Sequence, residues 1–287
     1  MDSKNTTTSD ENSDAKKIAQ QLGDLPELHP DLQSEIKRLR QKGFIELFHV
    51  KSIHQWLEDK KQSCEPGRIV GESRTGKTMA CNAYRFRNKP RQIPGKPPIV
   101  PVASIQVSED CSAKELFGLI LTELKYQVVS GTVADIRKRT LGVMKGCGVE
   151  MLIIDEAHIM KPKTFSDVRL IFDKLEISVI LIGTDELDKA IKKDPAVYNR
   201  FRPCYRLENL SGDEFKRTVE IWEKQVLKLP SPSNLSGKTM LKTLGAATGG
   251  YIGLMDMMLR GAAIKALKKG LSKIDLETLK EVAAEYR

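Results

Sequence analysis

Residues 71–78 read Gly71-Glu72-Ser73-Arg74-Thr75-Gly76-Lys77-Thr78, directly after the short apolar run Arg68-Ile69-Val70. The stretch fits the pattern G-x-x-x-x-G-K-[ST] of phosphate-binding loops, and a helix is expected to follow it. Glycines let backbone N–H groups wrap an anion, while the positive end of the helix dipole faces the same phosphates. We therefore expect these eight residues to bind ATP, with Lys77 neutralising the β- and γ-phosphate oxygens and Thr78 holding Mg²⁺ through its hydroxyl. A glycine-containing turn that matches the pattern by chance is the alternative.

A second motif is the apolar run Met151-Leu152-Ile153-Ile154, which ends in the acids Asp155 and Glu156. Such a run predicts a buried parallel strand, and ligands of open α/β sheets bind at the carboxyl ends of the strands. We expect Asp155 to orient the Mg²⁺ shell and Glu156 to polarise the water that attacks the γ-phosphate. Acids that merely cap the next helix are the alternative.

A further buried strand is predicted over residues 177–184, and it ends in the hydroxyl of Thr184. Thr184 is expected to hydrogen-bond the attacking water or the γ-phosphate. Further on, Arg200 and Arg202 flank Phe201 just ahead of a short strand. A fixed, bidentate cation is what a transferring phosphoryl group needs, and one supplied by a neighbouring subunit makes hydrolysis depend on assembly. Surface arginines held in ordinary salt bridges are the alternative, and the sequence does not rank Arg200 against Arg202.

Composition sets limits on the class of protein. The chain has 287 residues, of which 40% are apolar and 30% charged, as is usual for globular proteins that need no covalent staples. Its five cysteines are scattered without a C-x-x-C pair, so we expect neither disulfides nor a zinc site, and a reducing cytoplasm fits. No apolar stretch approaches twenty residues and no signal pattern opens the chain, so we expect no export and no membrane partner. The net charge of +9 favours a polyanionic partner, with a merely well-solvated basic surface as the alternative.

The order of patterns predicts an α/β protein with three parts. Residues 1–14 are almost all polar and are expected to form a disordered tail. Residues 15–207 contain the predicted strands and are expected to form a nucleotide-binding domain with a parallel sheet between helices. Residues 208–287 contain only helical patterns and are expected to form a small all-helical lid.

Two predicted helix starts can meet phosphates. Lys114 lies in the first turn of a helix that begins near Ser112, where a cation opposes the helix dipole unless an anion binds beside it. Thr132 and Asp135 form a capping pattern at the start of the next helix. Lys114 would contact a phosphate by charge, and Thr132 by its hydroxyl and backbone amide. For Thr132, capping without any ligand remains equally open.

The order of these motifs, followed by a helical lobe, resembles that of the AAA+ ATPases from about residue 16 to the end. Within them, the strings over residues 70–78, 147–157 and 250–253 resemble the TnsC/TniB transposition regulators, especially those of CRISPR-associated transposons. The resemblance implies an AAA+ P-loop domain with three αβα layers and a helical lid. It also assigns family roles to single residues: the phosphate-loop lysine to Lys77, the metal ligand to Thr78, the acidic pair to Asp155 and Glu156, the first sensor to Thr184, and the arginine finger to Arg200, with Arg202 second.

The resemblance further implies a bacterial, cytoplasmic and DNA-associated ATPase that uses ATP and Mg²⁺. Family members polymerise on duplex DNA as a homo-oligomeric filament or ring, and Lys114 and Thr132 fall where contacts to one DNA strand are implied. Such an assembly marks the target site, recruits a TnsB-like transposase and works with a TniQ-like target-selection protein and a CRISPR effector, and ATP hydrolysis dismantles it.

A replication-initiator or helicase-loader ATPase shares every motif except the longer strings and is the closest alternative. A DNA helicase would need a second nucleotide-binding lobe, and no strand pattern follows Leu207. One position departs from the family pattern. AAA+ proteins usually carry an arginine on the helix after the glycine turn, where this chain has Gly253 and Leu254, with Arg260 about two turns further on. How the lid senses the γ-phosphate is therefore an open question at this point.

Overall fold

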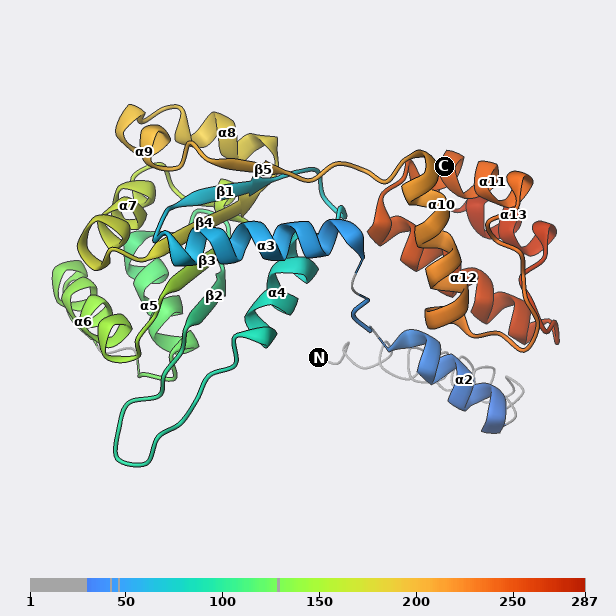
Figure 1. Cartoon of the computed structure of the whole chain (residues 1–287), viewed down its shortest axis with the longest axis horizontal. Coiled ribbons are helices and arrows are strands. Elements are labelled where there is room, and N and C mark those ends of the chain that lie inside the picture. The colour runs from blue at the N-terminus through green and yellow to red at the C-terminus, as the bar shows by residue number, and fades with distance from the viewer. Residues whose placement is uncertain (1–29, 42, 46, 128–129, 287) are drawn as a thin grey trace, which may run out of the picture.

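The computed structural model describes residues 30–286 except positions 42, 46, 128 and 129. The expected disordered tail over residues 1–14 lies outside the described residues. Figure 1 shows a lobe built around a β-sheet and a second lobe made of helices, joined near the end of strand β5. None of the described helices is long and apolar enough to cross a membrane.

Within the described residues, five parallel strands form one sheet in the order β2-β3-β4-β1-β5. Strands β3 and β4 are mainly apolar runs, because a parallel sheet is covered by helices on both faces. The strands are β1 (Gly67–Val70), β2 (Val102–Gln106), β3 (Met151–Asp155), β4 (Ser178–Gly183) and β5 (Cys204–Arg206). The strands predicted from the two apolar motifs at 151–156 and 177–184 are both present.

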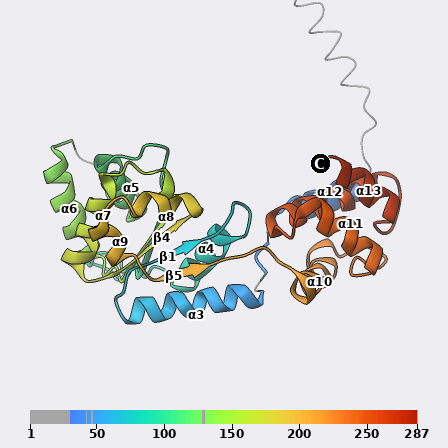
Figure 2. The same cartoon turned by 90° about the horizontal axis from the view of Figure 1, so that it is seen from above.

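Helices cover the sheet in two layers, as Figure 2 shows for α3 on one side and α5, α6 and α7 on the other. Alternate residues of each strand face opposite layers: Ile153 packs with the α3 and α4 side, and Ile154 packs with the other side. The first layer holds α3 (Phe48–Gln62) and α4 (Lys77–Arg87). The second holds α5 (Ala113–Glu123), α6 (Val133–Gly146), the short 3₁₀ turn η1 (Ala157–Ile159), α7 (Thr164–Leu175), α8 (Asp185–Ile191) and α9 (Pro195–Arg200).

The helices α5, α6 and α7 all begin at the edge of the sheet where the strands end. The chain leaves each parallel strand at this edge and must return along a helix to start the next strand at the other edge. Tyr126, just beyond α5, contacts Cys147 at the end of α6, so these two helices run in the same direction. At the other end, Arg137 of α6 pairs with Asp167 in the first turn of α7, with 2.6 Å between Nη2 and Oδ1. The three helix starts therefore lie at the same edge as residues 71–78, the phosphate loop.

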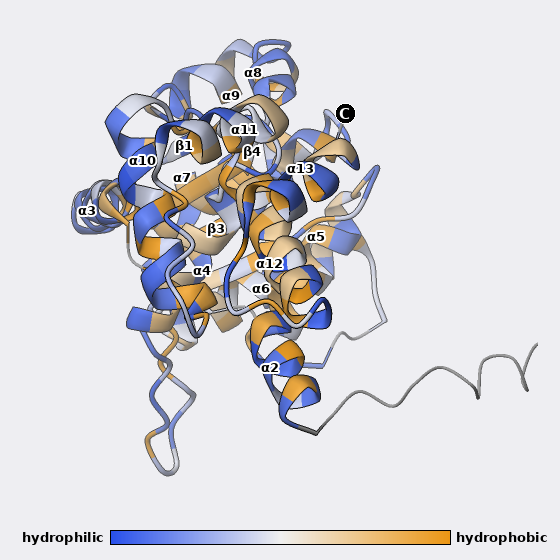
Figure 3. Cartoon of the chain, turned by 90° about the vertical axis from the view of Figure 1, so that its right-hand side faces the viewer, coloured by the Kyte–Doolittle hydropathy of each residue, from blue (hydrophilic) through white to orange (hydrophobic). Residues whose placement is uncertain are grey.

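The second lobe consists of helices, as expected for residues 208–287. It contains α10 (Gly212–Ile221), the π-helical turn η2 (Trp222–Leu227), α11 (Lys238–Thr248), α12 (Ile252–Lys268) and α13 (Leu276–Ala284). Helix α2 (Pro30–Arg40) packs on this lobe rather than on the sheet, because Arg38 donates to the carbonyls of Val226 and Leu227 at 3.0 and 2.6 Å. Figure 3 shows α2 and α12 with mixed apolar and polar positions, as helices with one buried face have.

Candidate nucleotide-binding site

The phosphate loop joins β1 to α4 at the carboxyl edge of the sheet. At Gly71 the backbone passes so close to β5 that a Cβ atom would lie 2.4 Å from the carbonyl oxygen of Leu207, so only glycine fits. Helix α4 makes its first internal hydrogen bond from Ala80 N–H to Gly76 O at 3.0 Å. The amides ahead of Ala80 have no acceptor within the helix, and they form the donor-rich, positive end that an anion occupies.

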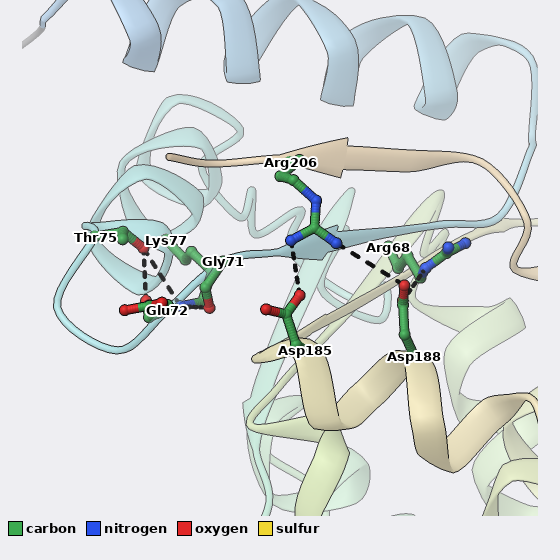
Figure 4. Close-up of polar contacts among 8 residues, drawn as sticks. All are labelled: Arg68, Gly71, Glu72, Thr75, Lys77, Asp185, Asp188 and Arg206. Atoms are coloured by element: carbon green, nitrogen blue, oxygen red, sulfur yellow. Dashed lines mark hydrogen bonds and ion pairs between the residues drawn. The ribbon is translucent and has the colours of Figure 1, made fainter. Parts of the chain in front are cut away.

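Lys77 is folded into the loop that precedes it. Its Nζ donates to the carbonyls of Gly71 at 2.8 Å and Glu72 at 2.6 Å, as Figure 4 shows, and the residue is 8% exposed. Burial lowers the pKa of Lys77, and the nearby carboxylates of Glu156 and Asp155 oppose that shift. The ammonium group is thus held by neutral carbonyls in a partly desolvated place, where an incoming phosphate oxygen would be a stronger partner than either carbonyl.

The oxygen atoms expected to bind Mg²⁺ lie side by side. Thr78 Oγ1 donates to Asp155 Oδ2 at 2.7 Å, and the other carboxylate oxygen accepts the backbone N–H of Glu156 at 2.9 Å. One hydroxyl and one carboxylate are hard donors that suit Mg²⁺, which keeps waters and substrate phosphates as its other ligands. Among the described residues no group of three or more His, Cys, Asp and Glu could form a metal cage. The donor set therefore fits a metal that enters with a nucleotide.

Glu156 has an unusual backbone conformation. Its φ of 56° lies in the left-handed region, and the short 3₁₀ turn η1 begins directly after it. Such a conformation costs a non-glycine residue roughly 1–3 kcal/mol and is common in active sites. The carboxylate is 40% exposed and lies 3.4 Å from Nδ1 of His158. It is therefore accessible to a water molecule, whereas the adjacent Asp155 is buried.

Thr184 and the lid meet the phosphate loop at one cavity. Thr184 is the N-cap of α8, but its side chain makes no capping hydrogen bond. The cavity has a volume of about 450 Å³ and is lined by residues 72–74, residues 184–186, Tyr251 and Leu254. The structure therefore brings the end of β4, the phosphate loop and the start of α12 together around a space open to a ligand.

The lid contacts the phosphate loop through the backbone of Gly253 and the side chain of Met257, whose Sδ lies 3.1 Å from Arg74 Nη1, and not through Arg260. Gly253 N–H, in the first turn of α12, donates to Arg74 O at 2.9 Å. Arg260 pairs with Asp256 of its own helix at 2.6 Å and donates to Leu39 O of α2 at 2.6 Å. The lid of this chain is therefore coupled to the loop that holds phosphate by the main-chain hydrogen bond from Gly253 and by the contact of Met257 with Arg74.

Replacing Gly253 with alanine is expected to lower nucleotide affinity about 10-fold, which corresponds to about 1.4 kcal/mol. A Cβ atom there would lie 3.0 Å from Cβ and 3.1 Å from O of Arg74, so the lid must move away from the loop. Titration with a fluorescent ATP analogue measures the effect. Gly261→Ala in the same helix is the control, because its Cβ would meet only Val282 Cγ1 at 3.8 Å. Equal affinities for the two variants would show that the main-chain contact does not affect nucleotide binding.

Arg200 and Arg202 lie at the opposite edge of the sheet from the phosphate loop of the same chain. β1 and β5 are adjacent and parallel, and Arg68 of β1 is opposite Cys204 of β5. The phosphate loop leaves the carboxyl end of β1, whereas both arginines precede the amino end of β5. The four residues of β1 separate the two edges by roughly 13 Å at 3.3 Å per residue. Figure 1 likewise shows α9, which ends at Arg200, far from the start of α4.

The two arginines differ in their present contacts. Arg200 Nε lies 3.2 Å from Asp173 Oδ1, and its side chain is 47% exposed. Arg202 is exposed and forms no ion pair with any residue in the described part of the chain. Both side chains can therefore contact a neighbouring molecule. Arg200 would do so by leaving Asp173 and pairing with an anion of that molecule.

Lys114 and Thr132 lie at the starts of α5 and α6, on the edge of the sheet shared with the phosphate loop. Lys114 is exposed in the first turn of α5, next to the N-cap residue Ser112. Thr132 is exposed as well, but its hydroxyl is part of a complete capping box with Asp135, with 2.6 Å between Oγ1 and Oδ2. These hydrogen bonds from Thr132 lower the pKa of Asp135. The capping role left open by the sequence is thus present for Thr132, and a phosphate contact would have to exist alongside it.

Sequence reasoning missed a network of charged residues behind the site. Arg68 on β1 is 6% exposed and pairs with Asp188 of α8 at 2.6 Å. Arg206 on β5 pairs with Asp185 of α8 at 2.7 Å (Figure 4). The available signal was an arginine at the start of the apolar run Arg68-Ile69-Val70, since charged groups are rarely buried without partners.

Comparison with models of protein families assigns the chain to a family. Residues 35–209, more than half of the chain, match the family described as bacterial TniB protein. The chain belongs to the TniB family. Among curated proteins, this TniB-family chain is 28% identical over 72 residues to a potential ATP-binding protein of Staphylococcus aureus. That match covers 25% of the chain and 27% of the relative, so the chain spans only about a quarter of this curated protein.

Solved structures share the fold of this TniB-family chain. The ORC2 protein of Aeropyrum pernix in ADPNP–ADP complexes has a TM-score of 0.66 and 15% identity, covering 87% of this chain and 71% of that one. The ORC1 protein of Aeropyrum pernix in complex with DNA has a TM-score of 0.63 and 13% identity, over 87% and 69% of the two chains. Drosophila ORC bound to DNA has a TM-score of 0.59 and 15% identity, over 99% and 70%. At these identities the likeness shows the fold, and the predicted AAA+ architecture with its parallel sheet, helix layers and helical lobe is confirmed.

Proposed function

We propose that this protein is an ATP-switched DNA-binding regulator of transposition. ATP shared between adjacent subunits builds a filament or ring on duplex DNA, the assembly marks the target site and recruits a TnsB-like transposase, and hydrolysis dismantles it. A TniQ-like target-selection protein and a CRISPR effector are the proposed further partners. The observation that carries the proposal is the position of Arg200 and Arg202 at the sheet edge opposite the phosphate loop.

That position supports an active site shared by two subunits. A transferring phosphoryl group needs a cation close to its equatorial oxygens. Neither arginine can supply it to the nucleotide of its own chain across the sheet, but either can supply it to the nucleotide of a neighbouring copy. Repeating the contact from copy to copy gives a head-to-tail assembly, which closes into a ring or continues as a helix.

The residues around the cavity divide the work of hydrolysis. Lys77 and the loop amides bind the phosphates, and Thr78 with Asp155 would hold Mg²⁺, which neutralises charge on the β- and γ-phosphate oxygens when bound. Glu156 orients a water for attack and accepts its proton, and Thr184 hydrogen-bonds the water or the γ-phosphate. The residues proposed for the nucleotide domain are 15–207, of which α2 packs on the helical lobe, and those proposed for the lid are 208–287.

The net charge of the chain and the position of Lys114 support DNA as the polyanionic partner. The chain carries a net charge of +9, and phosphate contacts supply most of the sequence-independent affinity for DNA. Two of the solved structures with this fold are described as bound to DNA. Lys114 lies in the first helical turn without an ion pair to a described residue, where the helix amides add to its attraction for a phosphate.

Lys114→Ala is expected to weaken DNA binding by a similar factor on all sequences and to reduce the salt dependence of log K by about one unit. The reason is that a phosphate contact releases a counterion but carries little base information. Fluorescence anisotropy at several salt concentrations on two unrelated duplexes measures both quantities. Lys145→Ala removes the same charge from the last turn of α6 and serves as the control. A loss confined to one sequence would contradict the proposed role.

The second candidate function is a replication-initiator or helicase-loader ATPase, which the likeness to ORC proteins favours. Electron microscopy of the protein on duplex DNA with an ATP analogue tests both proposals at the level of the subunit junction. We expect nucleotide between two subunits, with Arg200 or Arg202 of the neighbour at the γ-phosphate. Transposition in a reconstituted system, against loading of a replicative helicase, then separates the two functions.

A further inference from the structure

Arg68 is the buried centre of the charged network behind the site. Its Nε donates to Asp188 Oδ1 at 2.6 Å, and its Nη1 donates to the carbonyls of Phe201 and Arg202, each at 2.6 Å. The guanidinium also lies over the ring of Tyr198, 5.8 Å from its centroid. Figure 4 shows the Arg68 and Asp188 side chains meeting between β1 and α8. A buried guanidinium needs such partners, and its planar fork fixes their geometry.

The two carbonyls belong to the segment that carries the proposed arginine finger. Phe201 lies between Arg200 and Arg202, and its own side chain is fully buried. The backbone of Arg68 also donates to Pro203 O at 2.9 Å. The segment from 200 to 203 is thus held on the sheet by one residue of β1, while the side chains of both arginines remain exposed.

The same residue connects this segment to the nucleotide side of the chain. Arg68 is three residues ahead of Gly71. Its partner Asp188 is on α8, the helix capped by Thr184 at the cavity. Arg206 holds that helix from β5, by 2.7 Å to Asp185 and 4.0 Å to Asp188. Arg68 therefore lies where the strand before the phosphate loop, the helix after Thr184 and the arginine segment all meet.

We infer that Arg68 is a positioning residue for the arginine that acts on the neighbouring subunit's nucleotide. It does not touch the nucleotide, but it fixes the backbone of residues 201–202 and so the direction from which Arg200 or Arg202 reaches across the junction. The inference rests on the proposed function, since it requires an arginine acting between subunits. Displacing a positioned catalytic group by about 1 Å costs on the order of 100-fold in rate.

Arg68→Lys is the variant that tests this role. Lysine keeps the buried positive charge beside Asp188 but lacks the fork that binds two carbonyls as well. We expect ATP turnover of the DNA-bound assembly to fall about 100-fold, the loss typical of a catalytic group displaced by about 1 Å, while the affinity of the unassembled subunit for ATP stays within about threefold. Arg38→Lys is the matched control, because Arg38 likewise binds a carboxylate, Glu35, and two carbonyls but lies on the helical lobe. Turnover of that variant is expected to stay near the wild-type value.

Mixing of subunits separates a positioning role from a general structural one. The reference mixture combines a variant lacking both arginines (Arg200→Ala, Arg202→Ala) with Glu156→Gln, each inactive alone. Turnover is expected to return in this mixture, because the second protein lends its arginines to the intact site of the first. Arg68→Lys mixed with Glu156→Gln is expected to regain turnover in the same way. Arg68→Lys mixed with the variant lacking both arginines is expected to stay inactive, since neither protein then supplies a positioned arginine.

The opposite pattern would overturn the inference. If Arg68→Lys regained turnover with the double arginine variant and not with Glu156→Gln, Arg68 would act on the nucleotide of its own chain. No recovery in either mixture, with ATP binding intact and the reference mixture active, would also contradict a positioning role. An inactive reference mixture would instead refute the shared site, and the inference with it. The double variant Arg68→Met, Asp188→Leu removes the buried guanidinium and its partly buried carboxylate partner together. Loss of the fold through one unpaired charge in Arg68→Lys is then recognised by comparison.

Discussion

Lys77→Ala is expected to abolish ATP-dependent assembly on duplex DNA and to lower ATP affinity at least about 100-fold, because charge-assisted contacts to phosphate are the strongest the loop can offer. Lys77 is held inside the loop by the carbonyls of Gly71 and Glu72, so it is in place before the nucleotide arrives. Without it the β- and γ-phosphate charge is balanced only by backbone amides and the metal. Sedimentation with plasmid DNA, with and without ATP, measures assembly, and nucleotide titration measures affinity.

The fold should survive this substitution. Of the two carbonyls released by Lys77, that of Glu72 belongs to an exposed residue that lines the cavity, where water can replace the lost hydrogen bond. A thermal midpoint within a few degrees of the wild-type value would be the check. Lys89→Ala, just beyond the other end of α4, is the control for loss of a positive charge. Normal assembly of Lys77→Ala on DNA would mean that residues 71–78 do not bind the nucleotide that drives assembly.

Glu156→Gln is expected to preserve assembly and to lower turnover about 1000-fold, within the range typical for removal of a general base. Glutamine has the same shape but cannot accept the proton of the attacking water. It also leaves the hydrogen bonds of Thr78, Asp155 and Lys77 in place, because the Glu156 side chain makes none of them and only its backbone N–H binds Asp155. Release of phosphate and sedimentation, measured on one sample, separate the two effects.

Assemblies of this variant should also last longer than those of the wild type, because dismantling is proposed to require hydrolysis. Asp155→Asn is a useful comparison, since it alters the residue hydrogen-bonded to Thr78 and is expected to affect nucleotide binding as well as turnover. A Glu156→Gln protein that stays monomeric with ATP and DNA would count against the proposed switch.

The parts of the fold that the sequence predicts are those encoded by neighbouring residues. The phosphate loop, the strand ending at Asp155 and the strand ending before Thr184 are continuous strings of characteristic composition. The rule that parallel strands end at one edge then brings these residues together without knowledge of the sheet order. The all-helical region after Leu207 follows from the absence of strand patterns, and the structure contains the helices α10 to α13 there.

The contacts that the sequence does not predict join segments far apart in the chain. Arg68 meets Asp188 and the carbonyl of Arg202, more than one hundred residues away, and nothing in the local pattern of β1 names these partners. The packing of α2 on the helical lobe depends in the same way on Arg260. In the sequence, Arg260 lies about two turns beyond the position where AAA+ proteins usually carry a lid arginine. Only the folded chain shows that the lid meets the phosphate loop through Gly253.

The central claim is that ATP bound at the junction between two copies holds those copies together on DNA. Sedimentation of the wild-type protein with duplex DNA and a non-hydrolysable ATP analogue tests it most directly. The account predicts fast-sedimenting complexes of many copies only when nucleotide and DNA are both present. Protein that binds the analogue but remains monomeric and separate from the DNA would contradict it.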